Sequence, residues 1–227
     1  ATDKLNGAPV VNTKGQVIGL FNASGSNKSA VDVNYAKDFT LTGLSQNDAT
    51  MNQSNLRIGL PSKLEDALVA LMLSSEKSAN IHEETINDFI SKFPQVADGY
   101  NSQANVLIGK SNFTEADKVL QMAIAKANMK DEAYYNYARA IYYNAVNPAN
   151  KDKMKGVDWT LDKALDQVKR AYAIKPLNAY RHLQAQIIFA KGDYANAYNE
   201  FDALTKTDFN NPELYLEMAQ SRQHLGA

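Results

Sequence analysis

Cysteine is absent from the 227 residues, so the chain has neither a disulfide framework nor a thiolate metal site. An excess of one charge is missing too, because 24 Lys and Arg residues nearly cancel 25 Asp and Glu residues. The net charge of −1 creates no field that would hold a polyanion, so we expect no nucleic-acid partner. No apolar run approaches the ~20 residues of a membrane span, and we expect no transmembrane segment.

Several kinds of functional motif are also missing. Residues 1–20 lack a charged segment followed by an apolar core, so we expect no signal peptide in the chain as given. There is no Gly-rich phosphate loop, because the N-terminal glycines fit hairpin turns better. The three histidines, His82, His182 and His224, have no partner at a repeating metal-ligand spacing. We therefore expect no cofactor and no metal site.

The first part of the chain, residues 1–60, is predicted to be a β-rich segment followed by a linker. Residues 8–22 contain two β-branched runs separated by a turn in which Gly15 can take a positive φ, the pattern of a hairpin. A third such run occupies residues 30–33. A sheet of this size is marginal alone in water, so we expect it to pack on a neighbour. Residues 35–60 are polar and weakly patterned, as in a linker.

From residue 61 to the end, apolar residues recur at helical spacing. Pro61 suits a first helical turn, and Ser62 with Glu65 has the spacing of a capping box. These signals predict that residues 61–94 form a leading helical hairpin. Repeat arrays commonly need an atypical hairpin of this kind as a cap.

A repeat with a fixed period follows, and it can be phased from the turn at Gly192-Asp193-Tyr194. Small residues lie 34 positions apart in successive first helices, at Ala104 and Ala138 and again at Ala185 and Ala219. The second helices repeat one order of small and large residues, at Ala116, Leu120 and Ala123, at Ala164, Val168 and Ala171, and at Ala197, Phe201 and Leu204. Small residues let two helices approach, and large residues fill the space opposite them.

This period and this order of residues resemble the tetratricopeptide repeat family over roughly residues 97–227. The resemblance implies a mainly α fold, a tetratricopeptide-type α-α superhelix or solenoid, with the short β-hairpin segment at its N-terminus. Within the domain 61–227, the leading hairpin would be followed by repeats at 97–130, 131–177 and 178–211 and by a final helix at 212–227.

The middle repeat departs from the period. Ala138 and Ala185 are 47 rather than 34 residues apart, which places an insertion at residues 146–159 between the two helices. The inserted residues are mostly turn formers and charges, and Trp159 stands at their end. Two interpretations stay open: a surface loop that the stack tolerates, or an accessory loop whose tryptophan anchors a partner.

In the family that the chain resembles, the first helices line a concave groove that binds a protein or peptide. The resemblance projects that groove onto residues rich in aromatic rings and amides, which suit binding of an extended peptide. They are Asn101, Asn105, Ile108, Tyr135, Asn136, Arg139, Tyr142, Tyr143, His182, Gln186, Phe189, Gln220 and Gln223.

One subgroup of that family holds the terminal carboxylate of a chaperone tail with basic and Asn side chains. Asn105 and Asn136 match two of its positions, but Asn101 replaces a lysine, and Ala179 and Leu183 replace two basic residues. Without those cations a carboxylate loses its charge-assisted partners. We therefore expect no carboxylate-clamp function.

A second resemblance lies at the N-terminus, in Asn6-Gly-Ala-Pro-Val-Val-Asn12 followed by Gly15-Gln-Val-Ile-Gly19. About 20 residues resemble the region around the nucleophile of trypsin-like, high-temperature-requirement serine proteases. Asn6 occupies the nucleophile's position, and a general base cannot activate an amide as it does a hydroxyl group. Only five residues precede Asn6, whereas the family's His and Asp precede its Ser. We expect no enzymatic activity in this chain.

The sequence leaves several functions open. The first is a protein- or peptide-binding scaffold or adaptor. The second is the C-terminal, substrate-presenting or regulatory part of a larger trypsin-like protease or pseudoprotease, of which residues 1–60 would be a remnant. A surface module for glycan handling is a third, and the protease resemblance could also be a chance hairpin. The oligomeric state and the compartment are not specified, although we favour a bacterial, extracytoplasmic setting.

Overall fold

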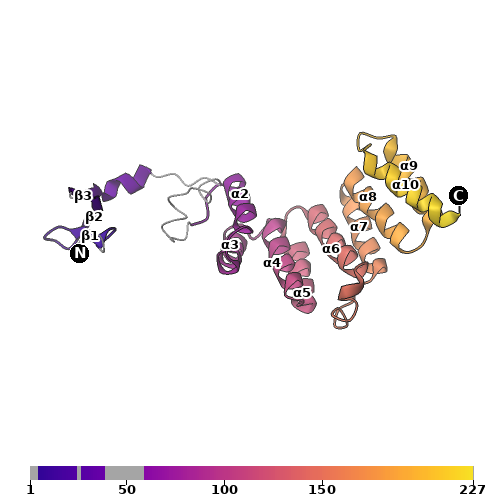
Figure 1. Cartoon of the computed structure of the whole chain (residues 1–227), viewed down its shortest axis with the longest axis horizontal. Helices are drawn as coiled ribbons and strands as arrows, with labels where there is room; N and C mark the ends of the chain where they lie inside the picture. The colour runs from indigo at the N-terminus through magenta and orange to yellow at the C-terminus, as the bar shows by residue number, and fades with distance from the viewer. Residues whose placement is uncertain (1–4, 25–26, 39–58, 227) are drawn as a thin grey trace.

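The computed structural model of the chain describes residues 5–24, 27–38 and 59–226. In these ranges the protein is mainly helical, with one small antiparallel sheet near the N-terminus (Figure 1). This confirms the predicted combination of a helical majority and a short β segment. Most of the predicted linker, residues 39–58, lies outside the described residues.

The sheet has three strands in the order β1-β2-β3: β1 Pro9–Val11, β2 Val17–Ser24 and β3 Asn27–Asp32. All pairings are antiparallel, and Gly15 adopts a φ of 75° in the turn between β1 and β2. The predicted hairpin is therefore present. A short 3-10 helix, η2 Val33–Asp38, follows the third strand.

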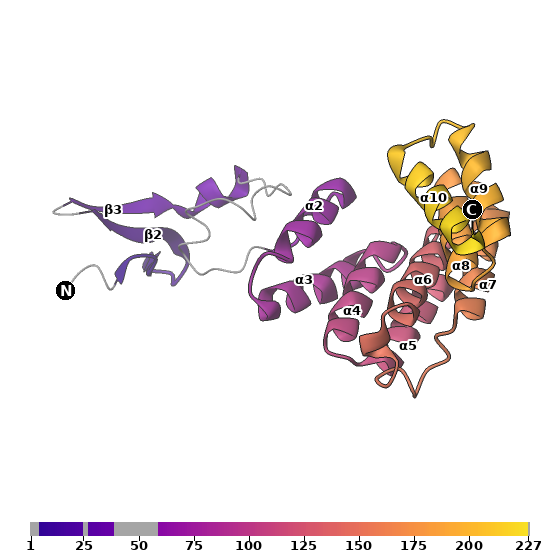
Figure 2. The same ribbon diagram turned by 45° about the vertical axis from the view of Figure 1, so that its right-hand side comes forward.

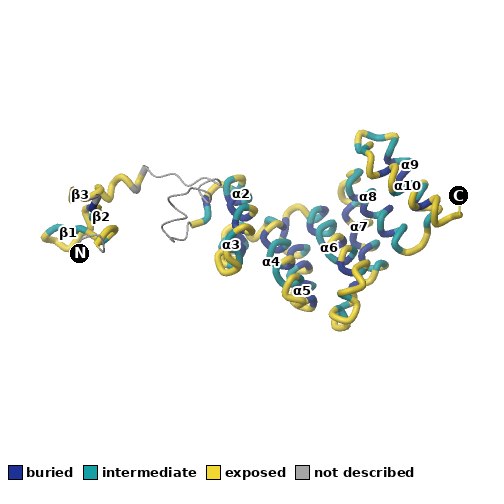
Figure 3. The backbone as a smooth tube through the Cα atoms, in the orientation of Figure 1, coloured by how far each residue is buried: buried dark blue, intermediate teal, exposed yellow. Residues whose placement is uncertain are grey.

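The sheet is almost entirely exposed (Figure 3). Val17, Ile18 and Val31 are exposed large hydrophobic residues, and among the sheet residues with described burial only Gly19 and Ala23 are buried. The expectation that the sheet packs on a neighbour is wrong for the described part of the chain. Three strands this short enclose no interior, so the sheet is held by its backbone hydrogen bonds.

Nine α-helices follow within residues 59–226. They are α2 Leu64–Ser74, α3 Ala79–Lys92, α4 Ala97–Gly109, α5 Phe113–Lys126, α6 Lys130–Ala145, α7 Leu161–Ile174, α8 Asn178–Ala190, α9 Tyr194–Thr205 and α10 Pro212–Leu225. Each helix packs against the next one along the chain, so that together they form an elongated row (Figures 1 and 2). None of the described helices combines the length and the apolar character that crossing a bilayer demands.

The repeated alanines lie where neighbouring helices cross. Ala104 on α4, Ala138 on α6 and Ala185 on α8 are completely buried. A methyl side chain at each crossing lets two helix backbones approach, which leaves the space between them to larger residues. Ala219 on α10 is exposed, because no described helix covers that side of α10.

The second helices pack in the predicted register. All nine of the predicted residues are 2% exposed or less, and they fall on α5, α7 and α9 with three on each helix. Figure 3 draws the buried segments of the helices in dark blue. The small and large residues that repeat in the sequence therefore form the core of the row.

The turns before α5 and α9 have the same backbone geometry and the same kind of helix cap. Gly192 adopts a φ of 87°, and the carboxylate of Asp193 then accepts a hydrogen bond from the backbone N–H of Asn196. Before α5, Ser111 adopts a φ of 59° and the side chain of Asn112 caps the helix in the same way. A left-handed residue followed by a capping side chain ends one helix and starts the next.

The predicted capping box of α2 does not form. The helix begins at Leu64, and its N-cap residue is Lys63, which makes no side-chain capping bond. The hydroxyl group of Ser62 instead accepts a hydrogen bond from Lys92 Nζ at 3.4 Å. A contact between α3 and the segment before α2 has replaced the local cap.

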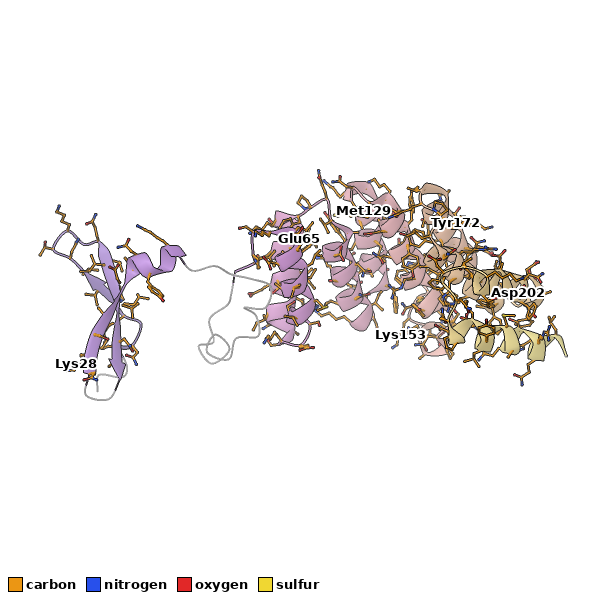
Figure 4. The ribbon with its side chains drawn as sticks, turned by 90° about the horizontal axis from the view of Figure 1, so that it is seen from above. Lys28, Glu65, Met129, Lys153, Tyr172 and Asp202 are labelled. Carbon is orange, nitrogen blue, oxygen red and sulfur yellow. The ribbon has the colours of Figure 1, made fainter. Side chains whose placement is uncertain are left out.

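The predicted insertion lies between α6 and α7. It contains the short 3-10 helix η4 Pro148–Asn150 and a series of turns, and it projects from the row at the ends of these helices (Figures 1 and 2). Lys153, which Figure 4 labels, lies in these turns and is exposed at the surface.

Candidate binding surface

Six of the predicted groove residues meet in one pocket between α4 and α6. We call it the α4/α6 pocket, and its volume is about 140 Å³. The predicted residues that line it are Asn101, Asn105, Ile108, Asn136, Arg139 and Tyr143. Side chains that project from two helices separated by α5 therefore form one surface.

The positive charge of this pocket is carried by Arg139. Its guanidinium carbon lies 5.6 Å from the ring centroid of Tyr135 and 5.9 Å from that of Tyr143. Within the described part of the chain, Arg139 forms no ion pair. Burial raises the pKa of the Tyr135 hydroxyl, and the nearby Arg139 charge opposes that rise. Two aromatic rings thus position a cation that has no carboxylate partner of its own.

The amide groups of the pocket are also free to bind. The side chains of Asn101, Asn105 and Asn136 make no hydrogen bond to any other described residue. Each amide offers two N–H donors and one carbonyl acceptor, the same groups that a peptide backbone presents in complementary form. The pocket can therefore accept and donate hydrogen bonds without first breaking a hydrogen bond to another described residue.

A larger hollow of about 570 Å³ lies on the other side of α4. Asn101 and Asn105 line it too, together with Leu68 and Met72 of α2 and Asp98 of α4. The contribution of α2 was not predicted from the sequence, because the groove was projected only from residue 97 onward. The apolar run of α2 was the available signal, since Leu68 and Met72 belong to it.

A serine and a histidine lie together near this hollow. Ser74 Oγ is 2.7 Å from His82 Nδ1, and it donates to the backbone carbonyl of Leu71 at 2.6 Å. Burial lowers the pKa of His82, and Glu83 opposes that effect. Ser74 is completely buried, so its hydroxyl group joins α2 to α3 and does not face a substrate.

A third group of predicted residues gathers around Glu217 of α10. His182 Nε2 lies 2.7 Å from Glu217 Oε2, and Gln186 Nε2 donates to Glu217 Oε1 at 2.7 Å. Burial raises the pKa of Tyr142, and Tyr143 and Glu217 add to that rise, so the carboxylate also acts on α6. Glu217 was missed, although it precedes Ala219 by two residues just as Asn136 precedes Ala138.

The remaining predicted residues lie elsewhere. Phe189 packs edge-on against Tyr194, at 5.2 Å between ring centroids, and against His224, at 5.6 Å. Gln220 and Gln223 are exposed on α10 and line neither of the two hollows. The structure thus brings together the predicted residues of α4 and α6 in one pocket, and His182 and Gln186 of α8 around Glu217, but places Phe189 and the two glutamines elsewhere.

Trp159 is not presented to a partner. Its side chain is 4% exposed, and its ring packs edge-on against Phe113 with 5.6 Å between centroids. Its indole N–H donates to Asp117 Oδ1 on α5 at 2.7 Å. Tyr137 also donates to Asp117, and the Lys163 ammonium group lies 3.4 Å away. The tryptophan therefore fastens the insertion to the protein's own core.

The polar groups around Asp117 favour its charged form. Burial raises the pKa of this carboxyl, but the hydrogen bonds from Tyr137 and Trp159 and the charge of Lys163 outweigh burial, so the pKa lies below its ordinary value. Burial and the bond to Asp117 raise the pKa of Tyr137. The network holds α5, α6 and α7 together.

Asn6 has a structural role in the sheet segment. Its Oδ1 accepts from the backbone N–H of Ala23 at 2.5 Å, and its Nδ2 donates to the carbonyl of Ala23 at 3.3 Å. An amide side chain has one acceptor oxygen and a donor nitrogen, so it can pair with both the N–H and the C=O of Ala23, as a residue of a neighbouring strand would. The side chain is therefore occupied by the end of β2.

No protein-family model matches the chain, and no curated protein matches it. The interpretation of the surface accordingly depends on its own residues. That surface combines unpaired amides, aromatic rings and one cation across α4 and α6 with carboxylates on α10.

Proposed function

We propose that this protein is a peptide-binding scaffold of the tetratricopeptide type and that the α4/α6 pocket is the centre of its binding groove. The observation that supports this most is the meeting of Asn101, Asn105, Asn136, Arg139 and Tyr143 in one pocket, as the repeat phase predicts. The fixed period of buried alanines and the shared turn geometry favour a superhelical arrangement of the hairpins. The proposal includes no catalytic turnover.

The chemistry of the pocket suits an extended peptide with an acidic side chain. The three asparagine amides can pair with peptide N–H and C=O groups, which an extended segment leaves unpaired. Arg139 can form a charge-assisted, two-pronged hydrogen bond with a carboxylate of the peptide. Tyr143 is 54% exposed, so it offers apolar contact area without first leaving a core.

A terminal carboxylate is not the expected anchor. Leu183, which stands where the chaperone-binding subgroup has a basic residue, is 2% exposed and belongs to the core. Ala179, at the other such position, is packed against the same core. We expect amidation of a peptide's C-terminus to leave its affinity for this protein unchanged, whereas replacing an internal Asp or Glu should weaken binding.

A display library of random peptides tests the proposal. Peptides enriched on the full chain should carry an acidic residue, and their affinity can be measured by fluorescence anisotropy. Arg139 is exposed in the free protein and would be covered by the bound peptide. Arg139→Ala should weaken binding by about tenfold, since an arginine that becomes buried at an interface typically contributes more than 1 kcal/mol. Thermal stability should change little, because Arg139 forms no ion pair with the described residues.

Arg170 provides a matched control. It lies on α7, and its guanidinium carbon is 6.0 Å from the ring centroid of Tyr134, so it also stacks on a tyrosine. Unlike Arg139, it also pairs with Asp166, at 2.9 Å, so the comparison uses peptide affinity and not stability. Arg170→Ala removes the same groups outside the pocket and should leave affinity unchanged. An equal loss in the two variants, or a library without enriched peptides, would contradict the proposal.

One observation favours a second candidate, the C-terminal part of a larger trypsin-like protein. The sheet exposes Val17, Ile18 and Val31, side chains that a surrounding β-barrel would cover. In that case the helices would present substrates or regulate the barrel, in an extracytoplasmic setting. Determining the mass of the natural gene product tests this, and a product that begins at or near Ala1 would exclude it.

A further inference from the structure

We propose that His182, Glu213 and Glu217 form a binding site for a divalent transition-metal ion, with Zn²⁺ the preferred ion, that bridges α8 and α10. The three residues offer an imidazole nitrogen and two carboxylate oxygens, and these ligand atoms all lie within 4.8 Å of one another. The inference does not depend on peptide binding.

The spacing of the residues is suitable for chelation. Glu213 and Glu217 are four residues apart on α10, so their side chains share one face of the helix. His182 approaches from α8, with its Nε2 2.7 Å from Glu217 Oε2. Zinc bonds of about 2.0–2.2 Å in a tetrahedron separate neighbouring ligands by roughly 3.4 Å. The distance between His182 Nε2 and Glu217 Oε2 would have to increase by less than ~1 Å. The Glu213 carboxylate, on an exposed side chain, would have to move closer to the other two ligands by up to ~1.5 Å.

The charges of the cluster are not balanced by the protein alone. Glu217 Oε2 has His182 Nε2 as a partner, but the carboxylate of Glu213 forms no hydrogen bond or ion pair within the described residues. The side chains of His182 and Glu217 are only 12% and 13% exposed, so water screens their charges poorly. A divalent cation held by a neutral imidazole and two carboxylates would make the cluster neutral.

The surroundings already fix the ligands. Gln186 donates to Glu217 Oε1 at 2.7 Å and so leaves Oε2 directed at His182. The ring of His182 lies against Phe201 and Phe209, with centroids 6.0 and 5.3 Å away. In metal sites, neighbouring residues orient the ligands through hydrogen bonds and packing of this kind.

The set of donor atoms selects the ion. Mg²⁺ and Ca²⁺ prefer sites made of oxygen ligands, whereas imidazole favours zinc and its neighbours among the transition metals. Three protein ligands leave a fourth position open for water or an anionic group.

Isothermal titration of the full chain, without an affinity tag and after treatment with a chelator, tests the site directly with Zn²⁺. We expect saturable binding of one ion per chain and an increase in melting temperature that EDTA reverses. Glu213→Gln should weaken Zn²⁺ binding by at least about tenfold. Because the Glu213 carboxylate has no partner in the described structure, this variant should fold as the wild type does. His182→Gln should weaken binding at least as much.

Glu65→Gln is the matched control. Glu65 is the second residue of α2 and Glu213 the second residue of α10, and both are exposed (Figure 4 labels Glu65). His224→Gln controls for an exposed histidine on α10. Both variants should bind Zn²⁺ with wild-type affinity. Absence of stoichiometric binding in the wild type, or unchanged affinity in Glu213→Gln, would overturn the proposal and leave a His182–Glu217 hydrogen bond only.

Discussion

The carboxylate of Asp117 on α5 accepts a hydrogen bond from the indole N–H of Trp159, which lies 42 residues further along the chain. Through this contact the end of the 146–159 insertion is joined to a helix that precedes α6. In repeat proteins each unit usually contacts only its neighbours. Here one acidic side chain connects the three consecutive helices α5, α6 and α7. Its removal should therefore weaken the packing of all three.

Trp159→Phe should lower the free energy of unfolding by about 2–3 kcal/mol, because it removes a hydrogen bond to a charged acceptor and leaves part of the site unfilled. Urea denaturation followed by circular dichroism measures the change. Tyr172→Phe on α7 is the control (Figure 4), since the Tyr172 hydroxyl makes no hydrogen bond to a described residue. Its effect should stay within about 0.5 kcal/mol. Equal effects would show that the Asp117 contact contributes nothing.

Stability should fall in acid partly through Asp117. Its pKa is lower in the folded protein than its ordinary value, so protonation favours the unfolded state. The contribution is fully present above the ordinary value of about 4 and is lost as the pH falls through the folded value. We expect the free energy of unfolding of the wild type to decrease more steeply below pH 5 than that of Asp117→Asn. Parallel pH profiles would contradict this assignment.

Alkaline pH should destabilise the protein through two tyrosines. Burial raises the pKa of Tyr137 and Tyr180, and their hydrogen bonds to Asp117 and Asp131 raise it further. For a tyrosine, a raised folded pKa means that stability is present below about pH 10 and is lost as the pH rises beyond it. The tyrosinate absorbance should show a late phase that coincides with loss of the helical signal. Tyr180→Phe should make that phase smaller, and a titration completed while the helices persist would refute the prediction.

Two glycines of α4 should respond oppositely to the same substitution. A Cβ atom on Gly99 would lie 2.8 Å from Ile90 Cγ1 and from Phe89 Cδ1, whereas a Cβ atom on Gly109 would meet nothing within 4 Å. Gly99→Ala should therefore destabilise the protein by about 1–3 kcal/mol, since Phe89 is completely buried and cannot move away. Gly109→Ala should be neutral or stabilising by up to about 1 kcal/mol. Melting temperatures of the two variants compare them, and a stabilised Gly99→Ala would mean that α3 and α4 pack more loosely.

The sequence predicted the helices well because their pattern is local and repeated. The fixed distance between Ala104 and Ala138 located the crossings, and both residues are completely buried. The turn at Gly192 could be predicted because only a few residue types adopt a positive φ. The capping box at Ser62 failed because a lysine from α3, far along the chain, took its hydroxyl group.

The candidate surface was predicted only in part. The repeat phase identified the residues of the α4/α6 pocket, because equivalent positions on parallel first helices face the same side. It gave no indication that His182 and Glu217 lie together, since the two residues are 35 positions apart and no local pattern links them. The buried indole of Trp159 donates to Asp117, 42 residues earlier, and no local pattern predicted this contact either. Contacts between distant residues are specified by packing and not by periodicity.

The exposed sheet at the N-terminus affects how the protein should melt. The four hydrophobic clusters of the described structure contain residues of the helices, of the segments beside them and of the 146–159 insertion, but none of the strands, so the strands share no interior with them. Cooperative unfolding requires such an interior, and amide protons of β1 to β3 should therefore exchange with solvent long before those of the central helices. Calorimetry should assign nearly all of the unfolding enthalpy to the helical row, with the strands contributing a separate, shallow transition.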